Sequence, residues 1–283
     1  MQQQPQMTTN FEPPPAYATD VLNPPLWNGP PGQLIPWLAN GSILDKYAIF
    51  GADSQVLQIN LLPNETVVSQ PGAMLYRGTD IGIKTGVGSC GDGCKRLIGG
   101  ESFFRNTYTN NGKTVESIAV SPAYPAKIIP IDLSRCGTIL AKPGGYIAHI
   151  GEVHISFQTV GVGAACFGGN GLWLLKLSGT GTVFVNGGGS VMEKILAPGE
   201  NLLVYHDALV GFSETAKYGI KRTGGCLTCC CGQEGLFNTM ITGPGLVMVQ
   251  SMSKERLAKV FAPKGGRNGG NRDANNESVN VTV

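Results

Sequence analysis

The sequence has little charge, few clustered basic residues and no long apolar run. Charged residues make up 14% of the 283 positions, and the formal net charge is +2, whereas about a quarter of the residues of a typical soluble domain are charged. No run of Lys and Arg exceeds two residues. Because nucleic-acid-binding proteins carry a basic patch or stripe, this pattern predicts no nucleic-acid partner and leaves that function as a third alternative, supported by fold analogy alone.

Membrane and targeting signals are also missing from the sequence. The apolar stretch from Gly161 to Leu175 carries no charge, but glycines interrupt it and it is shorter than the ~18 residues that a transmembrane helix needs. The N-terminus lacks the basic start and apolar stretch of a secretory signal. No Lys or Arg occurs from Met1 to Asp45, whereas mitochondrial presequences are rich in Arg. We therefore expect a cytoplasmic protein, with a mitochondrial location less favoured.

Residue sets typical of enzymes cannot be assembled from the sequence. Its three histidines are His149, His154 and His206. His206 precedes Asp207, and because neighbouring residues of a strand point to opposite faces, this pair predicts no catalytic dyad. The segment Gly86 to Gly91 has dinucleotide-fingerprint spacing but lacks the strand, helix and acidic residue of a βαβ unit. We expect no enzymatic activity, no catalytic residue and no cofactor.

Glycine and apolar residues, by contrast, are abundant. The chain contains 41 glycines, about twice typical usage, and 42% of its residues are hydrophobic. Apolar and polar residues alternate with a period of two in three segments: Val56–Leu61, Val153–Gln158 and Thr182–Asn186. This period indicates half-buried strands, and Gly-containing turns such as Asn110-Asn111-Gly112 and Asn186 to Gly189 separate them. The sequence predicts an all-β fold, with short helical turns at Gly93–Ile98 and Lys254–Phe261.

The composition divides the chain into three parts. Residues 1–43 are rich in Gln, Pro and Asn, and residues 263–283 are dominated by Gly and Asn. Such segments cannot bury enough apolar surface to offset the entropy of ordering, so we expect both to be disordered. The β core should therefore lie in residues 44–262.

One motif occurs three times within this core. Each copy begins with glycine, continues with a polar residue and a bulky apolar pair, and ends on Ser or Thr and a Gly-containing turn. The copies span 99–112, 168–181 and 232–245. Their structural glycines are Gly99, Gly100, Gly168, Gly169, Gly232 and Gly235. Self-similarity at a regular spacing predicts three fused repeats of short β-sandwich, jelly-roll-like units. We place them at about 44–112, 113–181 and 182–253, followed by a short C-terminal extension.

A second element recurs upstream of apolar, strand-like runs. Leu62-Pro63-Asn64-Glu65 resembles Ala197-Pro198-Gly199-Glu200, and Lys142-Pro143-Gly144-Gly145 is a weaker counterpart in the middle copy. Proline followed by Gly or Asn is typical of a turn.

These residues resemble the altered-inheritance-of-mitochondria protein 24 family, a mitochondrial biogenesis family. The resemblance covers about residues 44–253 and is carried by Gly51–Leu57, Pro71–Tyr76, Gly99–Phe104, Leu177–Gly181 and Gly235–Gly245. It implies a fold like that of the tryptophan RNA-binding attenuation protein, with three units fused per chain. It also implies that three chains close into a nine-unit ring, a homotrimer. It carries over no catalytic residue.

Cysteines cluster next to the repeated motif. Of the eight cysteines, Cys226, Cys229, Cys230 and Cys231 form one group beside Lys221-Arg222, and Cys90 and Cys94 precede the first motif copy. The group of four predicts S-acylation, because two or more acyl chains make a stable membrane anchor. Alternatively, Cys226-x-x-Cys229 has zinc-knuckle spacing, which Cys90 and Cys94 would complete to four thiolates. A third interpretation is unmodified thiols in loops.

The N-terminal arm contains a short recognition motif. Pro14-Pro15-Ala16-Tyr17 matches the Pro-Pro-x-Tyr ligands of WW domains, whose extended form loses little entropy on docking. With the motif copies and the cysteines, it makes a non-enzymatic scaffold or adaptor the leading hypothesis. Pro14, Pro15 and Tyr17 would bind a WW-domain protein, and the cysteine-rich loop would contact a membrane surface. The runner-up is a small-ligand or zinc-binding module that uses the clustered cysteines.

Overall fold

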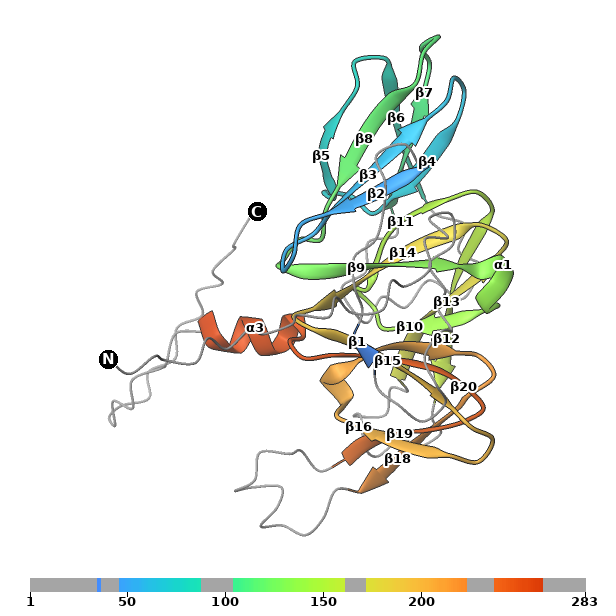
Figure 1. Ribbon diagram of the computed structural model, residues 1–283, viewed down its shortest axis with the longest axis vertical. Helices are drawn as coiled ribbons and strands as arrows, with labels where there is room; N and C mark the ends of the chain where they lie inside the picture. Colours follow the sequence, from blue (N-terminus) through green and yellow to red (C-terminus); the bar gives the residue numbers. More distant parts are fainter. Residues whose placement is uncertain (1–34, 37–45, 88–103, 161–171, 223–236, 262–283) are drawn as a thin grey trace, which may run out of the picture.

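The computed structural model describes residues 35–36, 46–87, 104–160, 172–222 and 237–261. These residues form antiparallel strands with only short helices, which confirms the all-β prediction. Figure 1 shows the sheets following one another along the long axis of the molecule, with the first strands at one end and the last strands at the other.

The strands fall into three successive segments of six. The first segment contains β3 (Val56–Leu61), β4 (Thr66–Ser69), β5 (Met74–Arg77), β6 (Ile81–Val87), β7 (Phe104–Asn110) and β8 (Glu116–Val120). The second contains β9 (Ala126–Asp132), β10 (Ile139–Ala141), β11 (Tyr146–Ile150), β12 (Val153–Val160), β13 (Leu172–Gly179) and β14 (Thr182–Gly188). The third contains β15 (Val191–Leu196), β16 (Asn201–Val204), β17 (Leu209–Ser213), β18 (Lys217–Arg222), β19 (Phe237–Thr242) and β20 (Gly245–Gln250). Two further strands, β1 (Ile35–Pro36) and β2 (Tyr47–Phe50), lie along β15 and β3.

The same antiparallel pairings occur in all three segments. The first strand of each segment pairs with its sixth, the third with the sixth, the second with the fifth and the fourth with the fifth. The predicted domain limits at about 112 and 181 fall inside the turns that join β7 to β8 and β13 to β14.

Neighbouring segments are joined by one more pairing of constant type. The second strand of one segment pairs with the third strand of the next, as β4 with β11 and β10 with β17. A six-stranded sheet (β6-β7-β4-β11-β14-β9) and a seven-stranded sheet (β1-β15-β20-β17-β10-β13-β12) therefore each contain strands of two segments. Two smaller sheets remain at the ends, four-stranded β2-β3-β8-β5 and three-stranded β16-β19-β18.

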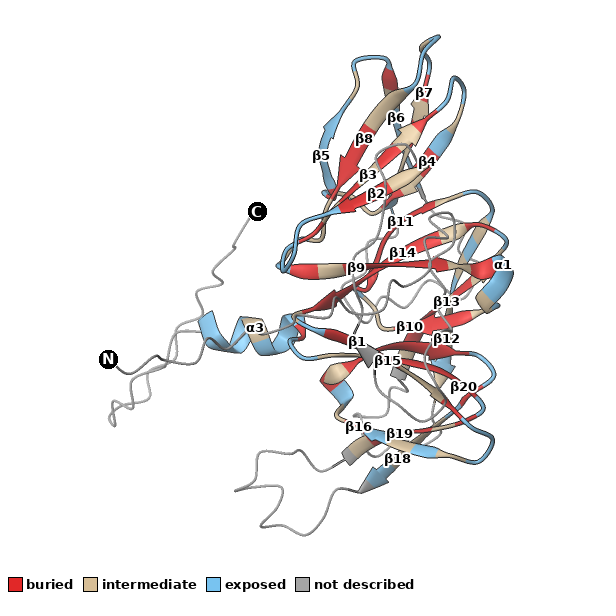
Figure 2. Cartoon of the chain, viewed as in Figure 1, coloured by how far each residue is buried: buried red, intermediate tan, exposed pale blue. Residues whose placement is uncertain are grey.

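Three apolar clusters fill the space between successive sheets. The first gathers side chains such as Leu57, Ile118 and Phe184, the second Ile131, Leu177 and Met248, and the third Phe212, Ile241 and Val247. Figure 2 shows buried residues along the strands of the two shared sheets and also on β3 and β8 of the four-stranded sheet. Alternation explains why these residues form strands: β3 buries Leu57, Ile59 and Leu61 and leaves the residues between them half-buried.

The helices only partly match the sequence expectations. Helix α3 (Lys254–Phe261) has the predicted bounds, and the predicted turn at Gly93–Ile98 lies outside the described residues. The sequence analysis missed α1 (Leu133–Cys136), a single turn. Its local signals are the Asp132 carboxylate, which accepts from the Ser134 N–H at 2.9 Å, and Gly137 with φ of 69° at its end.

Two turn predictions need correction, one in its position and one in its counterpart. Asn186 and the two glycines after it belong to β14, and the turn comes only at Gly189 and Ser190. A Cβ on Gly188 would lie 1.8 Å from the Met252 carbonyl oxygen, so close approach of backbone explains this glycine. Lys142–Gly145 joins β10 to β11 and so corresponds to Gln70–Ala73 between β4 and β5 rather than to Leu62–Glu65. A Pro-Gly pair therefore marks two different turns of the segment.

Candidate functional site

Strands β5 and β16 are the two strands whose place in the sheets differs most from that of their counterparts. Their counterparts (β11 and β17 for β5, β4 and β10 for β16) all lie inside a shared sheet with a partner on each side. Within the described residues, β5 pairs only with β8, and β16 only with β19. Each therefore presents one row of backbone N–H and C=O groups without a neighbouring strand among those residues.

The side chains of these two strands are exposed where those of their counterparts are buried. All four residues of β5 are exposed, whereas β11 and β17 are almost completely buried. Leu75 is 54% and Tyr76 49% exposed, while Ile147 of β11 is fully buried. Leu203 of β16 is 48% exposed, but Leu140 of β10 only 3%. Two apolar strand edges therefore lie at opposite ends of the chain of sheets.

The third strands of the three segments, β5, β11 and β17, can be matched residue by residue because each carries a bulge at the same place. Between the third and sixth strands of every segment the register shifts at one position, after Met74 in β5, after Tyr146 in β11 and after Leu209 in β17. The bulge thus fixes which residues correspond in the three segments.

The two joints between segments, the pairings of β4 with β11 and of β10 with β17, have the same register. The last residue of the second strand lies opposite the residue that follows the bulge: Ser69 opposite Ala148, and Ala141 opposite Gly211. One residue further on, Val68 lies opposite His149 and Leu140 opposite Phe212.

Side chains reinforce the first joint. The Tyr146 hydroxyl donates to the Val68 carbonyl oxygen at 3.1 Å and lies 2.8 Å from Nδ1 of His149. The Arg105 guanidinium carbon stands 4.9 Å from the centre of the Tyr146 ring. Burial, with a smaller contribution from the Arg105 charge, lowers the pKa of His149 to about 4, so the imidazole is neutral at physiological pH.

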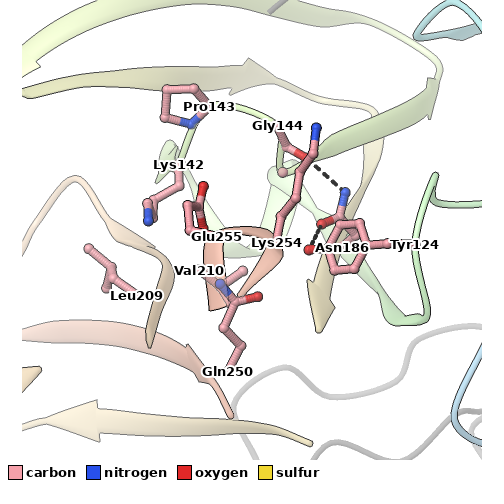
Figure 3. A pocket seen from close by; sticks show the side chains of 11 residues that line it. Tyr124, Lys142, Pro143, Gly144, Asn186, Leu209, Val210, Gln250, Lys254 and Glu255 are labelled. Atoms are coloured by element: carbon pink, nitrogen blue, oxygen red, sulfur yellow. Dashed lines mark hydrogen bonds between the residues drawn. The ribbon is translucent and has the colours of Figure 1, made fainter. Parts of the chain in front are cut away.

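A pocket opens beside the second joint, where α3 begins (Figure 3). It is open to solvent, and the side chains around it include Tyr124, Lys142, Asn186, Gln250 and Glu255. Asn186 spans its wall, because its Oδ1 accepts from the Tyr124 hydroxyl at 2.8 Å and its Nδ2 donates to the Gly144 carbonyl at 2.9 Å.

The charges of this pocket compensate one another. Lys142 Nζ lies 3.8 Å from the Asp207 carboxylate, and Lys254 and Glu255 line the same space. Burial, followed by the charge of Glu255, raises the pKa of Tyr124 to about 12, so its phenol stays protonated and serves as a hydrogen-bond donor. The pocket thus has a hydrogen-bonded wall, and the charges around it are balanced.

The expectation about His206 and Asp207 was wrong in its geometry. The two residues lie in a short 3₁₀ helix, η2 (His206–Ala208), rather than on a strand. Nε2 of His206 consequently comes within 3.1 Å of the Asp207 carboxylate. Burial outweighs the attraction of Asp207 and lowers the pKa of His206, and the carboxylate is shared with Lys142.

Every site residue predicted from the sequence lies outside the described residues. This holds for Pro14, Pro15 and Tyr17, for the six cysteines at 90, 94, 226, 229, 230 and 231, and for the six motif glycines. Among the residues that the structure does describe, no group of three or more His, Cys, Asp or Glu side chains is placed to hold a metal ion. Metal binding, acylation and WW-domain binding therefore stay predictions.

Sequence reasoning missed the residues of the two strand edges. Pro71-Gly72 before β5 and Pro143-Gly144 before β11 mark corresponding strands, so the signal for Leu75 and Tyr76 was present. A pattern of apolar residues cannot show that one copy of a strand lacks the partner that the other copies have.

Comparison with known proteins places these features in a family. Residues 47–252 match the model of the family described as mitochondrial biogenesis AIM24. An uncharacterised protein of Streptococcus pyogenes serotype M6 is 27% identical over 212 residues, which cover 72% of this chain and 84% of that protein. The crystal structure of a Streptococcus pyogenes protein has a similar fold, with a TM-score of 0.59 and 20% identity, and the match covers 76% of this chain and 96% of that one.

Proposed function

This chain belongs to the mitochondrial biogenesis AIM24 family, and on that premise we propose that it is a non-enzymatic scaffold that assembles head to tail into a ring of identical chains. The observation that carries the proposal is the pair of strand edges on β5 and β16. Each of the two internal joints pairs a second strand with a third strand of the next segment. The second strand of the third segment, β16, would form the same joint with the third strand of the first segment, β5, of another chain.

The strand count of the sheets supports this joint. The seven-stranded sheet combines four strands, β1-β15-β20-β17, with three, β10-β13-β12. The two end sheets hold four strands, with β2 in the place of β1, and three strands. Joined across β5 and β16 of two chains, they would complete a second seven-stranded sheet of the same composition.

The register of the joint follows from the internal ones. Val204 is the last residue of β16, and Tyr76 follows the bulge of β5. Applied to two chains, the internal rule places Val204 opposite Tyr76 and Leu203 opposite Arg77. The exposed Leu75, Tyr76 and Leu203 would then be covered as their counterparts are within the chain.

Three copies of one unit per chain, and three chains per ring, complete the proposal. The recurring pairings support the three units, and the resemblance to a ring-forming fold supports the trimer. Such a ring would present its loops and the N-terminal arms to partners in several copies, which raises effective affinity. In this proposal the Pro-Pro-x-Tyr arm binds a WW-domain protein and the cysteine-rich loop associates with a membrane surface.

A pair of charge substitutions tests the assembly. Leu203→Lys places a second positive charge opposite Arg77, and like charges directly opposite each other destabilise a strand pair. We expect the wild-type chain to have the mass of a trimer in solution and Leu203→Lys to have that of a monomer. The double variant Leu203→Lys/Arg77→Glu restores opposite charges and should recover the trimer.

Val115→Lys is the matched control, because Val115 is a similarly exposed apolar residue in the turn between β7 and β8. A monomeric wild-type chain, or a Leu203→Lys variant that keeps the wild-type mass, would contradict the proposed joint. Acylation is tested separately by hydroxylamine-sensitive labelling with a palmitate analogue, and the zinc alternative by metal analysis of the purified full-length protein.

A further inference from the structure

Helix α3 leaves the two apolar residues of its last turn exposed, while Leu257 one turn earlier is half-buried. None of its residues is buried, and Val260 and Phe261 are 71% and 78% exposed. Leu257, Val260 and Phe261 are three and four residues apart and therefore share one side of the helix. In Figure 2 most of α3 has the colour of exposed residues, and the helix extends outward from the stack of sheets.

The polar side of the same helix fastens it to the body. The Ser253 hydroxyl accepts from the Arg256 N–H at 3.1 Å and caps the helix. The Arg256 guanidinium carbon lies 4.8 Å from the centre of the Tyr205 ring, and Glu255 lines the pocket beside Lys142. A surface helix normally packs its apolar stripe on the core, but in α3 only Leu257 of that stripe is half-buried, and Val260 and Phe261 stay exposed.

The charge around the exposed face is positive. Lys254, Arg256 and Lys259 are exposed and are accompanied by one acidic residue, Glu255, whose carboxylate feels the opposite charge of Lys142. The following sequence, residues 262–272, adds three more basic residues and no acidic one, in a chain whose net charge is only +2. A short helix with a Val-Leu-Phe face and Lys and Arg around it has the chemistry of a segment that lies in a lipid interface.

We propose that α3 is a lipid-contacting helix that inserts Val260 and Phe261 into the headgroup boundary of an anionic membrane. Eight residues rise only about 12 Å, so the helix lies in the plane of the surface. No helix among the described residues is long and apolar enough to span a bilayer. The family match ends at residue 252, so α3 is a feature of this chain beyond the matched segment.

This inference rests on the proposed role at a membrane surface and adds a second contact to the cysteine-rich loop. Anionic lipid would attract the basic residues, and the apolar side chains would supply the buried area. In a ring, each chain would contribute one such helix, so weak single contacts would combine.

Flotation of the full-length chain with vesicles tests the proposal. One preparation consists of phosphatidylcholine alone and the other of an equal mixture of phosphatidylcholine and phosphatidylserine. We expect the chain to float with the mixed vesicles and to be released by high salt. Val260→Ser/Phe261→Ser should lower vesicle binding by about tenfold or more, because it removes the two most exposed apolar side chains of the helix. Val115→Ser, an exposed apolar residue far along the chain, should bind as the wild type does.

Measuring the oligomer mass of the same samples separates this inference from the proposed ring. Val260→Ser/Phe261→Ser should keep the wild-type mass, and Leu203→Lys should bind vesicles more weakly through loss of multivalency while retaining its dependence on anionic lipid. A wild-type chain that ignores both vesicle types, or binding that is unchanged in Val260→Ser/Phe261→Ser, overturns the assignment of α3. Trimer formation with no vesicle binding would leave the ring intact and remove only the lipid contact.

Discussion

At the scale of the residue, two buried ionisable side chains act on stability in opposite directions as pH changes. Burial lowers the pKa of His149 to about 4 and raises the pKa of Glu193 to about 7. Glu193 is buried on β15, and its Oε2 has no hydrogen-bond partner among the described residues. Both groups are therefore neutral in the folded form over a wider range than in the unfolded chain.

The first residue-scale prediction concerns His149. Its folded pKa lies below the ordinary value of 6.5, so its contribution to stability is complete above pH 6.5 and is lost as pH falls towards 4. We expect the free energy of unfolding of the wild type to fall by about 3 kcal/mol relative to His149→Phe over this interval. Phenylalanine suits the site because Phe212 is its counterpart at the second joint. Urea titrations of both proteins from pH 7 to 4 measure the difference, and a constant difference would contradict the prediction.

Glu193 makes stability depend on pH in the opposite direction. Its folded pKa lies above the ordinary 4.5, so the wild type loses stability as pH rises from 4.5 through 7. Glu193→Gln should leave stability at pH 4 nearly unchanged and raise it by up to about 3 kcal/mol at pH 8. Gln58 stands five residues before Pro63, just as Glu193 stands five residues before Pro198, so glutamine already occupies this position in the first segment. Thermal melts at the two pH values decide the matter, and a gain that is equal at both pH values refutes the pKa argument.

At the scale of the element, the outer edges of the first strands of the three segments are covered in different ways. The first strand of the first segment is covered by β2 and that of the third by β1. The corresponding edge of β9 is covered by a residue instead of a strand. The Gln55 N–H donates to the Ala126 carbonyl at 3.1 Å, and its side-chain Oε1 accepts from the Ile128 N–H at 2.7 Å. Pro130, which has no N–H, lies two residues further along β9.

Removal of the Gln55 side chain tests this edge protection. Gln55→Ala leaves the buried N–H of Ile128 without its acceptor, which should cost about 1–3 kcal/mol of unfolding free energy. We also expect a higher tendency to aggregate, because an uncovered strand edge pairs with other chains. Gln58→Ala, on a half-buried glutamine of β3, is the control. Chemical denaturation and light scattering on heating report the two effects, and a Gln55→Ala protein as stable as the control would argue against a role for this residue.

At the scale of the whole molecule, the proposed ring makes stability depend on concentration. A partner that binds only the folded chain raises the apparent stability by mass action. We therefore expect the Tm of the wild type to rise with protein concentration and that of Leu203→Lys to stay constant. A wild-type Tm that is independent of concentration over the range in which the trimer would dissociate contradicts assembly through β5 and β16.

Elements whose cause is local could be predicted from the residue pattern. Alternation in Val56–Leu61 identified a half-buried strand because burial on one face repeats every second residue. Thr182–Asn186 also forms a strand, but the expectation that it is half-buried was wrong, because β14 lies inside a shared sheet and is buried on both faces. Helix α3 was predicted with its observed bounds because apolar residues three and four apart need no distant partner to be recognised. The family resemblance, carried by short glycine-rich motifs, was likewise present in the sequence and is confirmed by the match over residues 47–252.

The pairing of strand edges and the covering of helix faces depend on contacts between distant parts of the chain. Ile147 and Leu75 follow the same turn, yet Ile147 is buried against β4 while Leu75 is exposed on β5. Likewise, the pattern of α3 gives an apolar face, but the structure leaves Val260 and Phe261 of that face exposed while Arg256 and Glu255 contact the body. His206 and Asp207 approach each other because the chain turns there as a 3₁₀ helix. In each case the deciding interaction joins residues far apart in sequence or depends on a backbone turn that no residue pattern encodes.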